Sequence, residues 1–113
     1  MNRLKENMMN RLKKITQHTE LSEKAIERKL VAECRKRCLL CLKFSSSTDI
    51  GFPDRLILVD GGRASWVEVK SAGKKPRKTQ LIRHEQLRAL GFRVYVIGRT
   101  SQIEPLLEEL IND

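Results

Sequence analysis

The sequence predicts a single α/β domain in which a mixed sheet is flanked by helices, with elements in the order αβββαβα. The 113 residues suffice for one hydrophobic core, because a second core would need roughly 50 residues of its own. Hydrophobic residues make up 40% of the chain, which is too many for a disordered tail. A strand–helix unit near the end of the chain favours a mixed sheet with helices against it.

The chain begins with a polar, basic stretch, and we expect residues 1–18 to form an arm ahead of a single domain over 19–113. The first helix of the domain is predicted over 22–37, with Thr19 or Ser22 as its N-cap. Its apolar face recurs at helical spacing in Ile26, Leu30, Cys34 and Cys38.

Short apolar runs between turn residues predict the strands. The first run covers 39–44 and the second covers 55–59. Asp60-Gly61-Gly62-Arg63 is a tight turn, so the third strand, over 64–70, should form a hairpin with the second. A fourth strand is predicted over 92–97.

Two more helices complete the domain. One is predicted over 79–90, where Gly91 ends it. A capping box from Ser101 to Glu104 should open the last helix. The apolar stripe of that helix consists of Ile103, Leu106, Leu107, Leu110 and Ile111.

The charge balance points to an anionic partner. The chain has 23 Lys and Arg against 14 Asp and Glu, a net charge of +9, and nucleic acid is the commonest partner of such a domain. No apolar run approaches the ~20 residues of a membrane span, and no secretory signal is recognisable. We therefore expect a soluble domain of the cytoplasm that binds no membrane.

The three cysteines are Cys34, Cys38 and Cys41, an odd number within one short segment. Such a set is a poor disulfide framework and suits a reducing compartment. The spacing raises the possibility of zinc, but both histidines are distant in sequence. We favour three small, buried side chains on one helix face or entering a strand.

Two carboxylates and a lysine form the candidate active site. Glu68 and Lys70 lie two apart in the third strand, so their side chains leave the same face of the sheet, as does that of Trp66. Asp54 precedes the second strand, and the hairpin should bring it beside Glu68 and Lys70. Separately, Pro-Asp and Glu-x-Lys are common, so their joint placement across a hairpin is the stronger signal.

This combination suits phosphodiester hydrolysis with a divalent metal. Mg²⁺ prefers oxygen ligands and commonly takes one or two carboxylates, and it lowers the pKa of a bound water. A neighbouring lysine can orient that water and offset the developing negative charge. Glu27 falls within the apolar arc of the first helix, and it either reaches this site or pairs with a nearby Lys or Arg.

The motif Pro53-Asp54 followed by Glu68-Val69-Lys70 resembles the PD-(D/E)xK nuclease superfamily, with its restriction-endonuclease-like fold. The stretches 51–56 and 91–96, together with Gln80, resemble more narrowly the VRR-NUC family, the virus-type replication-repair nucleases of small phage or bacterial type. The resemblance covers about 20–100. It implies a Mg²⁺ cofactor, for which Mn²⁺ can substitute, and a bacterial or phage-infected cytoplasm.

The resemblance also implies roles for individual residues. Lys70 would be the catalytic lysine and Gln80 the helix glutamine. Glu23 is a second candidate for the helix glutamate. The metal ligands would be Asp54, Glu68, the backbone carbonyl of Val69, and Glu27.

Four cations follow the candidate site within five positions, namely Lys74, Lys75, Arg77 and Lys78. They directly precede a helix N-terminus, where phosphate contacts are favoured, although many charge runs are simply solvated. Gln80 either lies near the scissile phosphate or is an exposed helix residue. His84, one turn further on, either contacts DNA or lies on the surface.

These observations favour a metal-dependent endonuclease for branched DNA. The small members of the VRR-NUC family resemble homodimeric Holliday-junction resolvases, and a two-fold dimer offers two sites to a two-fold junction. A non-catalytic basic nucleic-acid-binding module is the alternative from another class. A nuclease acting on flaps or on plain duplex DNA is a further alternative.

Overall fold

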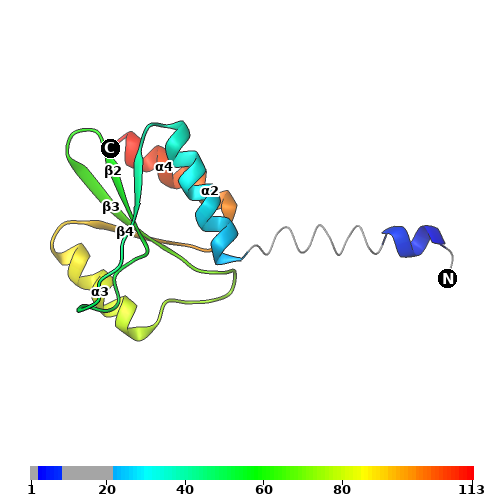
Figure 1. Ribbon diagram of the computed structural model, residues 1–113, viewed down its shortest axis with the longest axis horizontal. Helices are drawn as coiled ribbons and strands as arrows, with labels where there is room; N and C mark the ends of the chain where they lie inside the picture. Colours follow the sequence, from blue (N-terminus) through cyan, green and yellow to red (C-terminus); the bar gives the residue numbers. More distant parts are fainter. Residues whose placement is uncertain (1–2, 9–21) are drawn as a thin grey trace.

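The computed structural model describes residues 3–8 and 22–113 (Figure 1). Residues 3–8 are helical, and the rest of the predicted arm, with Thr19, lies outside the described residues. None of the described helices is long and apolar enough to cross a bilayer. The elements from residue 22 onwards are α2 (Glu23–Lys36), β1 (Leu40–Lys43), β2 (Arg55–Val59), β3 (Arg63–Val69), α3 (Lys78–Ala89), β4 (Arg93–Ile97), a 3₁₀ turn (Thr100–Gln102) and α4 (Ile103–Ile111).

The four strands form one mixed sheet in the order β1-β2-β3-β4. β1 pairs with β2 and β2 with β3 in antiparallel fashion, whereas β3 and β4 are parallel. Parallel neighbours need a crossover connection, and α3 supplies it. The predicted αβββαβα order and the mixed sheet are confirmed.

Helices cover both faces of this sheet. Figure 1 shows α2 and α4 against one face and α3 on the opposite side. On the first face Val67 and Val69 join the core formed with α2 and α4, while Trp66 packs with Leu87 of α3 on the second. The alternation predicted for the third strand is therefore correct, and it sends Glu68 towards α3.

Helix α2 begins as predicted but ends earlier. Ser22 is its N-cap, and its Oγ accepts a hydrogen bond from Ala25 N at 3.2 Å. At the other end Leu39 N donates to Cys34 O and Cys38 N to Arg35 O, the pair of bonds that defines a Schellman motif. This motif places Cys38 at a φ of 57°, where it is exposed.

The prediction that Cys38 shares the apolar face was therefore wrong, because the helix ends at Lys36 and Cys38 is already in the left-handed conformation that follows the C-cap. Cys34 is buried in the core, and Cys41 of β1 packs against the same core. The thiols of Cys34 and Cys41 interact directly. The preferred interpretation of small core side chains thus holds for these two cysteines.

The start of α4 also differs from the prediction. The 3₁₀ turn precedes the helix, and the side chain of Gln102 takes the capping role assigned to Ser101 and Glu104. Its Oε1 accepts hydrogen bonds from Gly98 N at 2.7 Å and from Arg99 N at 3.0 Å. The earlier turn moves the free N–H groups away from Ser101.

Candidate active site

The carboxylates of Asp54 and Glu68 meet at the edge of the sheet where β2 begins and β3 ends. Arg55 pairs with Val67 in the antiparallel register. Asp54, which precedes Arg55, therefore lies beside Glu68, which follows Val67. Asp54 Oδ2 accepts a hydrogen bond from Val69 N at 3.2 Å. The two carboxyl groups also interact with each other. The hairpin thus produces the juxtaposition that the sequence predicted.

Glu68 is a buried acid with a strongly perturbed pKa. Its side chain is 1% exposed. Burial, followed by the hydrogen bond and the charge of Asp54, raises the pKa of the Glu68 carboxyl to about 8, and Glu23 acts in the same direction. Lys70 opposes this rise. The protein therefore holds acidic groups together where their mutual repulsion favours a cation between them.

His84 lies in the interior against this site. It is 1% exposed, and its Nε2 lies 3.5 Å from Glu68 Oε1. Burial lowers the pKa of the imidazole, and the charges of Arg88 and Lys70 lower it further against the opposing charge of Asp54, so the neutral form of the ring is favoured at pH 7. Both sequence-based interpretations of His84, as a DNA contact or a surface residue, were wrong because α3 turns this side chain towards the sheet.

Orphaned polar atoms gather at this pair. Glu68 Oε1 and both ring nitrogens of His84 are buried without a hydrogen-bond partner among the described residues. Leaving such groups unpaired costs free energy in the folded state. A buried acceptor oxygen facing a cluster of acids is the feature expected of a cation ligand.

The two helix glutamates occupy different environments. Glu27 Oε1 accepts a hydrogen bond from Arg55 Nε at 2.7 Å, in a half-buried ion pair. Glu23, one turn earlier, accepts from Ser71 N at 3.2 Å and lies near enough to Glu68 to raise its pKa. The structure thus gives Glu27 the cationic partner considered from the sequence and brings Glu23 to the edge of the candidate site.

Gln80 and the basic loop lie at the start of α3. Gln80 Oε1 accepts a hydrogen bond from Arg77 N at 2.8 Å, which caps the helix. No acidic residue occupies the first turn of α3. The partial positive charge of this helix N-terminus is therefore not offset by a carboxylate. Exposed cations lie beside it, namely Lys74, Lys75, Arg77 and Lys78.

The donor set fits Mg²⁺ or Mn²⁺ through two carboxylates. Over 3–8 and 22–113 no three His, Cys, Asp or Glu residues gather into a metal-binding group. Two carboxylates, completed by a backbone carbonyl and by substrate and water oxygens, nevertheless match the ligation that Mg²⁺ favours. Asp54 and the unpartnered Oε1 of Glu68 would supply the two carboxylates of such a site, and Val69 the carbonyl.

His84 is the residue of this site that the sequence analysis missed. The available signal was its position three residues before Leu87, since both belong to one buried stripe of α3. That stripe was hard to recognise because Leu81 and Ile82 are each 49% exposed on the same helix. Apolar residues on the exposed face of α3 thus made the buried face, which carries His84, unrecognisable from the sequence.

Comparison with known proteins agrees with the geometry. No family model matches the sequence. Over 77 residues the chain is 42% identical to "Putative nuclease p44" of Acyrthosiphon pisum secondary endosymbiont phage 1, covering 68% of this chain and 83% of that protein. A solved structure described as "VRR_NUC domain" is similar with a TM-score of 0.72 and 29% identity, over 78% of this chain and 97% of that chain.

The mixed four-stranded sheet with its flanking helices is therefore a restriction-endonuclease-like fold. The chain belongs to the VRR-NUC family and is a nuclease.

Proposed function

We propose that this nuclease is a divalent-metal-dependent endonuclease that cuts branched DNA in the manner of a Holliday-junction resolvase. Water would attack the phosphorus while the bond to the 3′ oxygen breaks, leaving a 5′-phosphate and a 3′-hydroxyl. The observation that carries this proposal is the contact between the carboxyl groups of Asp54 and Glu68, beside Lys70.

The proposed metal ligands are Asp54, Glu68 and the carbonyl of Val69. A further carboxylate for the metal would come from α2, and we propose Glu23 for this role in preference to Glu27, because Arg55 already neutralises Glu27. When bound there, Mg²⁺ polarises the scissile phosphate and lowers the pKa of a neighbouring water.

Lys70 is the proposed catalytic lysine. It directly follows β3, and its charge acts on both Glu68 and His84. An ammonium group at this position can orient the attacking water and offset the negative charge that develops on the phosphate. Gln80, in the first turn of α3, accepts a hydrogen bond from the backbone of the basic loop and would contact the same phosphate through its amide N–H groups.

His84 is the proposed positioning residue of the site. Its neutral ring can donate one N–H, and Glu68 Oε1 is an acceptor 3.5 Å from its Nε2. A hydrogen bond from a buried ring would fix the orientation of the Glu68 carboxylate once it is ionised. Groups behind metal ligands commonly contribute to affinity in this way.

The basic loop before α3 is the proposed grip on the substrate backbone. Lys74, Lys75, Arg77 and Lys78 are exposed, and cations at a helix N-terminus destabilise the helix rather than support it. A bound phosphate would remove that repulsion. These residues therefore suit recognition of the DNA backbone, independent of base sequence.

The proposed assembly is a homodimer. A four-way junction has two-fold symmetry and must be cut twice, so a two-fold dimer matches it. Three apolar side chains are 49–68% exposed, namely Ile50 and two residues of α3, Leu81 and Ile82. A second copy would cover them, and light scattering of the wild type and of Ile82→Glu tests this: the wild type should be a dimer and the variant a monomer.

A cleavage assay tests the proposed function directly. A labelled four-way junction, a flap and a plain duplex are incubated with Mg²⁺, Mn²⁺ or EDTA. We expect paired nicks in the junction with either metal, and none with Lys70→Ala or Asp54→Ala. Lys29→Ala removes an exposed cation of α2 and should leave cleavage intact.

Each alternative has its own signature in this assay. Tight junction binding without cleavage in the presence of metal would favour the non-catalytic binding module. Equal cutting of all three substrates would retain the nuclease and reject junction specificity. Cleavage that persists in EDTA would reject the metal.

A further inference from the structure

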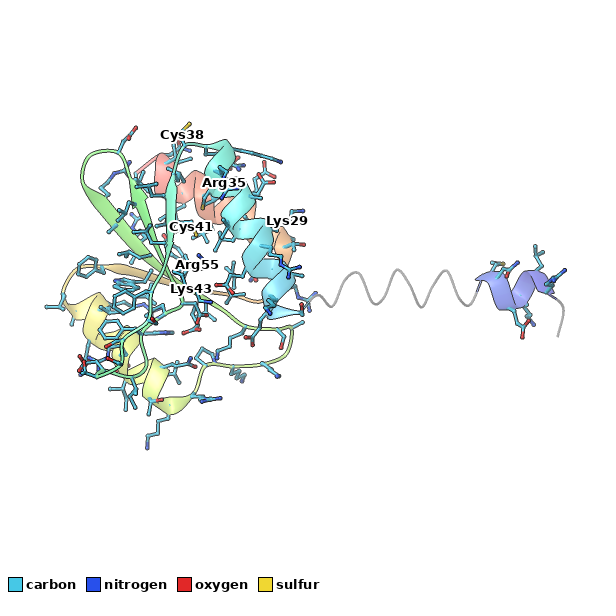
Figure 2. The ribbon with its side chains drawn as sticks, viewed as in Figure 1. Lys29, Arg35, Cys38, Cys41, Lys43 and Arg55 are labelled. Carbon is cyan, nitrogen blue, oxygen red and sulfur yellow. The ribbon has the colours of Figure 1, made fainter. Side chains whose placement is uncertain are left out.

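A groove of about 320 Å³ lies between α2 and β1, outside the candidate active site. We call it the α2–β1 groove. Figure 2 shows Lys43 and Arg55 next to each other beside α2, in agreement with their pairing across β1 and β2. The groove is lined by Lys24, Glu27, Arg28, Val31, Lys43 and Arg55.

The charges of the groove are unbalanced. Among the described residues that line it, Glu27 is the only acid, and the ion pair with Arg55 at 2.7 Å already neutralises that acid. Lys24, Arg28 and Lys43 are exposed, and their side chains form no ion pair with any residue that the structure describes. Three cations thus face the groove without a counter-charge from the described chain.

Two of these cations are unfavourably placed in α2. Lys24 lies in the first turn, where positive charge opposes the helix dipole, and Arg28 lies four residues further on, where its like charge repels that of Lys24. By contrast, Lys36 near the end of α2 pairs with Glu33. Cations that are unfavourable in the free protein are expected to bind an anion.

The groove borders the strand ends that carry the candidate active site. Arg55 directly follows Asp54, and Phe44 N, adjacent to Lys43, donates to Asp54 O at 2.9 Å. At the other rim of the groove, Glu23 precedes Lys24, and its Oε1 accepts a hydrogen bond from Ser71 N, two residues after β3. The groove is therefore a neighbour of the candidate active site, where phosphates next to the scissile one would lie.

We propose that the α2–β1 groove binds the phosphodiester backbone of the substrate strand on one side of the cut. This inference rests on the proposed DNA substrate and adds a second contact surface to the basic loop before α3. From Lys24 to Val31 the helix rises about 10 Å, which matches about three phosphates of one strand. An extended polyanion fits this length better than a single small anion.

The test compares two variants that lose the same charge. Arg28→Gln/Lys43→Gln removes two unpaired cations of the groove and leaves the Glu27–Arg55 pair intact. Lys29→Gln/Arg35→Gln removes two exposed cations from α2 that do not line the groove, and Figure 2 labels both residues. Junction and duplex binding are measured by fluorescence anisotropy in EDTA at several salt concentrations, with circular dichroism as the check on folding.

We expect the groove variant to bind at least roughly tenfold more weakly than the control, with a salt-dependence slope smaller by about two. Neutral methylphosphonates, introduced one at a time, then locate the contact. Some of them should weaken binding by the wild type but not by the groove variant. Those positions should be adjacent and lie on one side of the cut.

Equal affinities and equal salt slopes for the two variants would overturn the inference. So would neutral phosphates that weaken both proteins alike. If the wild type instead fails to bind or cut any of the three DNA substrates, the proposed function itself fails. Cleavage by the wild type with no effect at the groove rejects only the groove.

Discussion

His84 Nε2 of α3 lies 3.5 Å from Glu68 Oε1 of β3, and each side chain is 1% exposed. A neutral imidazole and an acid with a raised pKa therefore share the buried end of the site. Neither has its full set of hydrogen bonds in the free protein. The active site thus lowers the stability of the fold, and the first two predictions measure that cost and the role of His84.

Glu68 should make the metal-free protein less stable at alkaline pH. Its folded pKa is about 8 and its ordinary value 4.5, so the folded state retains a proton that the unfolded chain has released. The free energy of unfolding in EDTA should fall as the pH rises through this range. His84, whose pKa is lowered, acts in the opposite direction only below its ordinary value of 6.5.

Urea unfolding between pH 6.5 and about 8 therefore separates the effect of Glu68 from that of His84. Glu68→Gln keeps the shape of the side chain, and we expect it to abolish the slope and to be more stable than the wild type at pH 8. Saturating Mg²⁺ should remove the slope of the wild type, because a bound cation keeps the folded Glu68 ionised, as it already is in the unfolded chain at this pH. A variant less stable than the wild type at pH 8 in EDTA would contradict the prediction.

His84 should contribute to metal affinity. We expect His84→Leu to weaken Mn²⁺ binding roughly 10- to 100-fold in calorimetry, whereas His84→Gln, which keeps an N–H donor, should lose less. His84→Leu removes two unpaired nitrogens, so its stability in EDTA should not fall. With His84→Leu, kcat should fall while KM for DNA stays the same. Equal Mn²⁺ affinity in all three proteins would exclude the role.

The two helix glutamates should behave differently when neutralised. Glu23→Gln should lower the cleavage rate at least roughly tenfold and weaken Mn²⁺ binding, because Glu23 lies near Glu68. Glu27→Gln releases Arg55, so it should lower stability by about 1 kcal/mol and leave Mn²⁺ affinity unchanged. The reverse pattern would assign the metal to Glu27.

Gly51 should tolerate no side chain. Its φ is +87°, and a Cβ there would lie 2.5 Å from the Thr79 carbonyl oxygen at the start of α3. We expect Gly51→Ala to lower the free energy of unfolding by at least about 2 kcal/mol. Gly62→Ala is the control, because Gly62 also has a positive φ, of +71°, but a Cβ there would meet no atom of a non-neighbouring residue within 4 Å. Thermal unfolding measures both variants, and an equal loss of stability in Gly51→Ala and Gly62→Ala would mean that only the positive φ matters and not the contact with Thr79.

Cys38 should be better replaced by glycine. It has a φ of 57° at the position after the C-cap of α2, where glycine is usual. Cys38→Gly should stabilise the protein by about 1 kcal/mol in chemical unfolding. Cys38→Ala also removes the thiol but keeps the strained backbone, and it should bring no gain. A gain of equal size in both variants would attribute the effect to the thiol.

The order of elements and the Asp54–Glu68 contact were predictable because they depend on local rules. Alternation along β3 fixes which residues share a face, and a tight turn fixes which residues of a hairpin are neighbours. The N-cap at Ser22 is likewise a local hydrogen bond. The end of α2 was less predictable, because a cysteine occupies the position where glycine normally gives the signal.

The sequence by itself therefore determined the class of fold, the hairpin and the pairing of two carboxylates with a lysine. Only the tertiary structure decided that His84 is buried against Glu68, that Arg55 neutralises Glu27, and that Glu23 lies near Glu68. These contacts join residues from different elements. They depend on how each helix is rotated and placed against the sheet, and that placement follows from the packing of the whole core rather than from any local pattern.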